Sequence, residues 1–199
     1  MIKSLLFPNI PKWKYINLAE YAKEIKGNPL WRNELELEGT LYGGFLENRS
    51  PLFDERHITD RVIHLGVDYW VPENTKVLCP YDGIIVDATP CTKTKGGWGG
   101  RIDIQISGLI WIFGHLENPT LKVGKSIKAG DVIGIIAPKE RNGFWHPHLH
   151  LQISSQENYD KYPIKRDMDA YAIPSENLYE EYKNPDNYPF FLIVFCPKY

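Results

Sequence analysis

The chain has 199 residues, of which 43% are hydrophobic and 24% are charged, and its formal net charge at pH 7 is −2. This length suits one domain with small appendages, and the apolar content is sufficient for a core. The near-neutral charge gives no basic surface signal, which excludes a nucleic-acid partner as a first interpretation.

The start of the chain does not have the pattern of a secretory signal peptide. Its apolar stretch, Leu5 to Phe7, is short, Pro8 and Pro11 interrupt it, and no small-residue cleavage site follows. No apolar run reaches the length of a membrane-spanning helix. We therefore expect no membrane span and a cytoplasmic location by default, with extracellular or periplasmic action open through another export route.

Two helices are predicted, both outside the centre of the chain. The first covers residues 18–26, where Asn17 is an N-cap, Glu20 completes a capping box and Gly27 is a stop signal. The second covers residues 176–183 and lies between two prolines.

Between residues 61 and 154 the pattern changes to short β runs separated by glycine-containing turns. The predicted strands are 76–79, 83–88, 101–106, 110–115, 131–137 and 148–154. Such density without helical periods predicts a mainly β fold, an antiparallel sandwich or barrel-like core. We expect a β core over residues 51–155, an N-terminal extension with one helix over 1–50, and a C-terminal extension over 156–199 packed on the core.

Three cysteines, Cys79, Cys91 and Cys196, include no C-x-x-C pair. This pattern argues against a thiolate zinc site or a disulfide framework. Buried, unreactive thiols are the expected state, and the spacing does not decide whether Cys79 and Cys91 pair.

The segment HPHLHLQ at 146–152 carries the most chemical information. Alternate side chains of a strand share a face, so His148, His150 and Gln152 point one way, and the leucines between them point into apolar packing. A metal-bearing strand needs this division between a polar and an apolar face. The alternative is a half-exposed strand with surface histidines.

A second segment, HLGVD at 64–68, places His64 and Asp68 four residues apart. Imidazole and carboxylate are suitable zinc donors, and with His150 they make a set of three protein ligands that leaves a fourth position open. An open position is typical of a catalytic zinc site. On its own, the pair is equally consistent with a turn that contains a capping aspartate.

A third segment, FGHL at 113–116, places His115 at the end of an apolar strand. Such a residue lies at the rim of a sheet, where it can reach a cleft. Taken alone it would be an ordinary rim histidine; in combination with the other two segments it becomes a candidate catalytic group.

These motifs occur in one order along the chain: HLGVD, KVLCPYDGIIV, GGWGGRIDIQI, FGHL, LKVGKSIKAGDVIGII and HPHLHLQ. Over about residues 61–154 the order resembles the lysostaphin/LytM-type peptidases, family twenty-three of the metallopeptidases, which have the duplicated hybrid motif fold. The resemblance implies a narrow groove and one zinc ion per chain. It also implies hydrolysis of a peptide bond, typically in peptidoglycan cross-links or glycine-rich bridges.

Transferred by motif, the resemblance makes His64, Asp68 and His150 the zinc ligands. It makes His148 the general base, and His115 would assist it or stabilise the oxyanion. The sequence departs from the family pattern at Phe113, at the aromatic approach to H-x-H (FWHP, 144–147), and at Gln152, where glutamate is frequent. These departures leave the cleavage specificity open.

Several alternatives remain at this level. A non-catalytic binding module on the same fold is one, and a cytoplasmic peptidase acting on small peptides is another. A lipoyl-carrier-like sandwich would fit KVGKSIKAGDVIG at 122–134 but leaves the histidines unexplained. Asn48 could approach the metal as a latency device, as an asparagine does in some relatives, and Arg49 could approach the groove; an ordinary turn is the expected interpretation of both. Neither the substrate-binding residues nor the oligomeric state follows from the sequence.

Overall fold

The computed structural model describes residues 1–31, 35, 39–53, 60–91, 96–117, 119–162, 168–174 and 178–188. The α-helices are α1 (Ile2–Leu6), α2 (Leu18–Ile25), α3 (Gln156–Asp160) and α4 (Leu178–Glu181). The strands are β1 (Trp13–Tyr15), β2 (Thr40–Gly43), β3 (Ile63–His64), β4 (Val67–Trp70), β5 (Lys76–Leu78), β6 (Gly83–Thr89), β7 (Gly100–Ile106), β8 (Leu109–Leu116), β9 (Ser126–Ile127), β10 (Val132–Ile135), β11 (Leu149–Ser155), β12 (Tyr171–Ala172) and β13 (Tyr182–Lys183).

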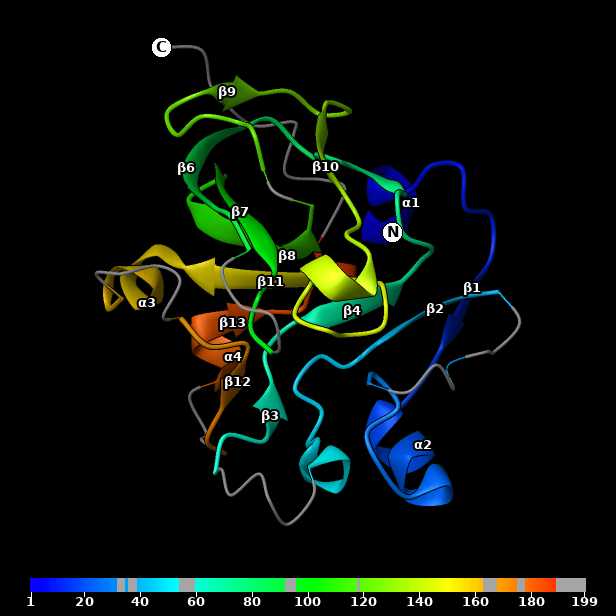
Figure 1. The fold of residues 1–199 in the computed structure, drawn as a ribbon. Helices are drawn as coiled ribbons and strands as arrows, with labels where there is room; N and C mark the ends of the chain where they lie inside the picture. The colour runs from blue at the N-terminus through cyan, green and yellow to red at the C-terminus, as the bar shows by residue number, and fades with distance from the viewer. Residues whose placement is uncertain are drawn as a thin grey trace.

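One large sheet organises the molecule. Its strands run in the order β1-β2-β4-β11-β8-β7-β6-β9, and β13 also pairs with β11. All neighbours are antiparallel except β1 and β2, which are parallel, so the sheet is mixed. Two-stranded sheets join β10 to β5 and β12 to β3. Figure 1 shows α2 and α3 on opposite sides of the ribbon. The predicted mainly β fold is confirmed.

Strand β8 explains how the sheet is buried on both faces. Trp111 and Phe113 lie in the main core with the leucines of β11, whereas Ile110 and Ile112 pack in a second cluster with Tyr159. A strand that is apolar on both faces must be covered on both faces. Residues after β11 supply that second cover.

The first predicted helix is α2. The side chain of Asn17 accepts a hydrogen bond from the Glu20 amide, and Lys26 ends the helix in the left-handed conformation (φ 50°) just before Gly27. The second predicted helix is shorter than expected. Helix α4 ends at Glu181, because Tyr182 and Lys183 pair with Ile153 and Ser154 as strand β13.

Cys79 is buried, and Cys79 and Cys91 do not form a disulfide with each other. Cys196 lies outside the described residues. Among the described parts of the chain, no helix is long and apolar enough to span a membrane.

Candidate active site

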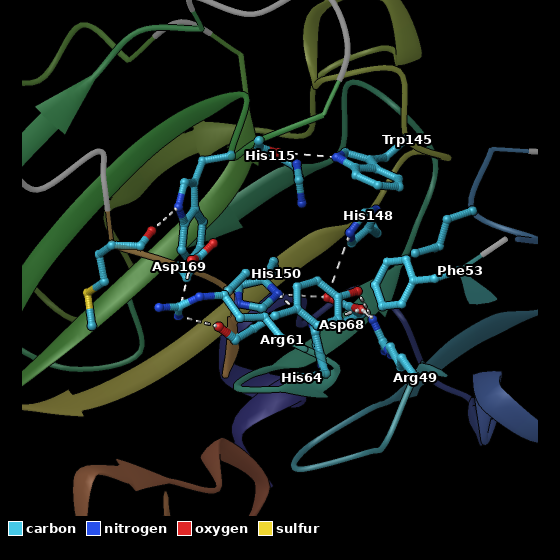
Figure 2. Close-up of a pocket in the computed structure, with 16 residues that line it drawn as sticks. Arg49, Phe53, Arg61, His64, Asp68, His115, Trp145, His148, His150 and Asp169 are labelled. Carbon is cyan, nitrogen blue, oxygen red and sulfur yellow. Dashed lines mark hydrogen bonds and ion pairs between the residues drawn. The ribbon is translucent and has the colours of Figure 1, made fainter. Parts of the chain in front are cut away.

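Three strands bring a histidine, an aspartate and a second histidine together. His64 ends β3, Asp68 lies in β4, and His150 of β11 is the direct cross-strand partner of Asp68. His150 Nδ1 lies 3.0 Å from both His64 Nε2 and Asp68 Oδ1. All three side chains are buried, and their donor atoms lie within 4.8 Å of one another (Figure 2).

Neighbouring groups fix which ring nitrogens carry protons. His64 Nδ1 lies 3.0 Å from the Gly44 carbonyl, which can only accept a hydrogen bond, so the His64 proton is on Nδ1. Each nitrogen of His150 faces an oxygen acceptor: Nδ1 lies 3.0 Å from Asp68 Oδ1, and Nε2 lies 3.3 Å from Gln152 Oε1. His64 Nε2 therefore carries the lone pair that faces His150 Nδ1 and Asp68. Two imidazoles with one carboxylate are donors that suit zinc, and Gln152 Oε1 would accept the Nε2 proton of His150 when Nδ1 binds a metal.

The charge states of His64 and Asp68 suit the binding of a cation. Burial lowers the pKa of His64 to about 4, so its ring is neutral near pH 7. Burial alone would raise the pKa of Asp68, but His64 and Arg49 hold it well below its usual range. The carboxylate is therefore ionised and the imidazole is unprotonated, which are the states in which each binds a metal.

Two further histidines lie beside this cluster. His148 Nε2 is 3.7 Å from Asp68 Oδ1, and the His148 and His115 ring centroids are 4.3 Å apart. His148 Nδ1 donates to the His146 carbonyl at 2.6 Å, and His115 Nδ1 donates to the Asn142 carbonyl at 3.1 Å. Each ring therefore presents an unprotonated Nε2.

Burial makes both of these histidines weak bases. It lowers the pKa of His148 to about 4 and that of His115 well below its usual value. His115 also has φ 62°, a left-handed backbone that only a few per cent of non-glycine residues adopt. Such a conformation at the end of β8 is the kind of local strain that occurs at functional sites.

The five residues line one pocket of about 460 Å³. Its other walls include Leu30, Trp98 and Trp145, and Figure 2 shows Trp145 at the end where His115 and His148 lie. Trp145 also packs against Trp31, with ring centroids 5.0 Å apart. Trp145 of the FWHP approach and Leu30 of the N-terminal region therefore form part of the pocket, and Trp31 packs against Trp145.

The structure brings together all five residues named from the sequence motifs, and it adds three that the motifs do not reveal. The Trp98 ring lies 5.0 Å from the His150 ring, and the Tyr171 ring lies 5.2 Å from that of His64. The third is Arg49, which is fully buried against Asp68. Asn48 does not line the pocket: its side chain accepts from the Ser50 amide at 3.0 Å, and its backbone forms an isolated β-bridge with Ile63.

The model of peptidase family M23 matches residues 62–161, a segment that includes all five residues and the strands β3 to β11. The chain belongs to peptidase family M23. This family consists of zinc-dependent peptidases, in agreement with the donor set described above. The resemblance drawn from the ordered motifs is thereby confirmed.

Several known proteins match parts of the chain. The DD-carboxypeptidase/endopeptidase Mpg of Neisseria meningitidis is 30% identical over 95 residues, which are 47% of this chain and 21% of Mpg. The catalytic domain of lysostaphin from Staphylococcus simulans is 25% identical, with 59% of this chain and 80% of that chain covered and a TM-score of 0.41. The prophage-encoded M23 protein EnpA from Enterococcus faecalis is 18% identical, with 76% and 93% covered and a TM-score of 0.49. The chain thus spans about a fifth of its curated relative.

Proposed function

We propose that this protein is a zinc-dependent endopeptidase that hydrolyses peptide bonds in peptidoglycan cross-links or glycine-rich bridges. One observation carries the proposal: ligand atoms of His64, Asp68 and His150 lie within 4.8 Å of one another, next to two further histidines in the same pocket. His64, Asp68 and His150 are the proposed ligands, with one zinc ion per chain.

Zinc bound there would supply Lewis acidity, which polarises the scissile carbonyl and lowers the pKa of water to about 7. His148 is the proposed general base. Its Nδ1 proton is held by the His146 carbonyl, so Nε2 is the atom that takes the proton of the attacking water. His148 Nε2 lies 3.7 Å from Asp68 Oδ1, beside the proposed ligands.

His115 is proposed to assist His148. Because its Nδ1 proton goes to the Asn142 carbonyl, a neutral His115 has no proton on Nε2 to donate to an oxyanion. It can stabilise an oxyanion only after it has accepted a proton. Of the two roles that the resemblance allows, proton transfer alongside His148 therefore agrees better with the hydrogen bonds.

The names of two relatives support the substrate class. Mpg is named for carboxypeptidase and endopeptidase activity, and lysostaphin is described as an antimicrobial peptidase. The pocket of this chain offers tryptophan walls and a rim pair between Arg61 and Asp169 (3.3 Å). These features suit an extended peptide with few bulky side chains, such as a cross-link or an oligoglycine segment.

The test combines metal analysis with hydrolysis of purified cross-linked muropeptides and of pentaglycine. We expect about one zinc ion per wild-type chain, and loss of that ion in His64→Ala, Asp68→Ala and His150→Ala. His148→Ala should keep zinc and lose about 10²- to 10⁴-fold in turnover. Asp82→Ala is the matched control, since Asp82 is an exposed aspartate paired with Lys128 outside the pocket.

The results distinguish the alternatives. A wild-type protein that binds no zinc would overturn the proposal. Zinc binding without hydrolysis of any cross-linked or glycine peptide would favour a non-catalytic binding module. Activity restricted to small free peptides would favour a peptidase that does not act on the cell wall. Full turnover in His148→Ala would remove that residue from the base role.

A further inference from the structure

Arg49 is a buried cation in direct contact with a proposed metal ligand. Its side chain is 1% exposed, and Nη1 donates to Asp68 Oδ2 at 2.7 Å. Its Nε donates to Glu47 Oε2 at 2.9 Å, and Nη1 also lies 3.3 Å from the Tyr171 hydroxyl. Figure 2 shows the guanidinium next to Asp68, on the side of the carboxylate away from His150.

The pairing of β2 with β4 places this arginine beside Asp68. Gly43, the last residue of β2, is the direct partner of Asp68 in β4. The chain that follows β2 therefore begins opposite the carboxylate. It then runs alongside β3, where the Leu46 amide donates to the His64 carbonyl and the Arg49 amide donates to the Val62 carbonyl.

This loop, residues 44–49, contacts two of the three proposed ligands. Its first residue, Gly44, accepts the Nδ1 proton of His64, and its last, Arg49, holds Asp68. Gly44 (φ 106°) also makes room for the guanidinium, because a Cβ atom there would collide with Arg49 Nη2 and with the His64 ring. Contacts that orient metal ligands in this way often change metal affinity when they are mutated.

The two oxygens of Asp68 have different surroundings. Oδ2 is bound by Arg49 and lies 3.4 Å from His64 Nε2, whereas Oδ1 faces His150 at 3.0 Å and His148 at 3.7 Å. The hydrogen bond from Arg49 Nη1 to Oδ2 restrains rotation of the carboxylate, and with it the direction in which Oδ1 points.

The charge of Arg49 should by itself repel a divalent cation. Glu47 offsets it: this carboxylate is 6% exposed and pairs with Arg49 Nε, while its other oxygen accepts from the Ala19 amide near the start of α2 at 2.7 Å. The arginine is therefore held from both sides, by the N-terminal region and by the ligand. Two buried charged groups, those of Arg49 and Glu47, therefore act on the orientation of one carboxylate, that of Asp68.

We propose that Arg49 is a positioning residue, which orients Asp68 for the metal and ties the residue 44–49 loop to the site. This inference rests on the proposed function, because it concerns the same ligands. Geometry, rather than charge, is the property through which Arg49 acts.

Two substitutions separate geometry from charge. Arg49→Gln removes the charge, and Arg49→Lys keeps the charge but loses the planar fork that joins Glu47 to Asp68. If Arg49 acts through geometry, both variants should bind zinc about 10- to 100-fold more weakly than the wild type, measured by competition with a chromogenic chelator. The visible spectrum of the cobalt-substituted protein, which reports ligand geometry, should change in both.

The opposite pattern would overturn the inference. If only charge matters, Arg49→Gln should bind zinc more tightly and Arg49→Lys should resemble the wild type. Equal zinc affinity and an unchanged cobalt spectrum in both variants would likewise exclude a positioning role. Arg141→Gln is the control: Arg141 pairs with Glu117 at 2.8 Å but is exposed and lies outside the pocket, so its zinc affinity should stay unchanged.

A substitution at Glu47 covers the case in which the Arg49 variants do not fold. Glu47→Gln keeps the side-chain size and loosens the hold on Nε. It should weaken zinc binding and shift the cobalt spectrum, and a wild-type result in both measurements would contradict the inference. Failure of the wild-type protein itself to bind zinc would count against the proposed function, whereas wild-type binding with unaffected variants would count against Arg49 alone.

Discussion

Gly66 lies between the two ligand-bearing positions of H-x-x-x-D, and its replacement by alanine would disturb the site sterically. A Cβ atom at this position would lie 2.6 Å from the Leu151 carbonyl oxygen and 2.7 Å from the Cε1 and Nε2 atoms of the His150 ring. These distances are roughly 1 Å short of an ordinary van der Waals separation. The backbone oxygen belongs to β11, whose Leu151 is paired with Val67 of β4, so it cannot retreat without opening that pairing.

The size of the effect follows from these contacts. Overpacking of a tight site costs about 1–3 kcal/mol, and the backbone neighbour places Gly66→Ala at about 2–3 kcal/mol. For a domain of this length that corresponds to a fall in Tm of roughly 5–10 °C. The His150 ring must also move, and because metal–ligand distances tolerate only about 0.2 Å, zinc affinity should fall at least about tenfold.

The assay is thermal unfolding with and without zinc, together with a zinc competition titration. Gly108→Ala is the matched control, because Gly108 has φ 78° with nothing within 4 Å of a Cβ atom. It should lose about 1 kcal/mol through backbone strain and keep its zinc affinity. A Gly66→Ala protein with wild-type stability and zinc affinity would refute the steric reasoning.

Three further substitutions test other parts of the structure. Gln152→Leu removes the oxygen that faces His150 Nε2 at 3.3 Å and should weaken zinc binding by about 10-fold or more in the same titration; unchanged affinity would show that this contact does not orient the ring. Tyr159→Phe removes a 2.7 Å hydrogen bond to buried Asp103 and should cost about 2 kcal/mol in chemical denaturation, without affecting zinc; a loss below about 0.5 kcal/mol would contradict this estimate. Asn17→Ala removes the cap of α2 and should cost about 1 kcal/mol, which Asn17→Asp should largely restore.

Local sequence patterns predicted the central strands and the arrangement of β11 well. The alternation in HPHLHLQ follows from strand geometry alone, and the structure places Leu149, Leu151 and Ile153 in the core on the side opposite His150. That β11 lies beside β4, with His150 opposite Asp68, does not follow from spacing. The family resemblance implies that the two residues share a metal ion but does not give this pairing, because strand order depends on long-range contacts that short patterns do not encode.

Two features differ from what the sequence patterns favoured, for physical reasons. Tyr182 and Lys183 continue a helix-like pattern, but tertiary pairing with β11 makes them a strand. Arg49 follows turn residues, and an arginine in a turn is ordinarily solvated. Its burial depends on β2 ending opposite Asp68, a pairing that joins segments 25 residues apart (Gly43 and Asp68).

The charges around Asp68 suggest why the site uses an arginine at all. Neutral His64, His148 and His115 contribute no charge, so Glu47, Arg49 and Asp68 together leave one net negative charge in a buried region. Burial of an uncompensated pair of carboxylates would be costly, and one of them would tend to take up a proton. His64 and the Arg49 guanidinium prevent this for Asp68, because they hold its pKa well below its usual range. A divalent cation held by the proposed ligands would bring these groups to one net positive charge. The charge of Arg49 therefore balances the buried carboxylates, while its proposed action on the metal site lies in the orientation of Asp68.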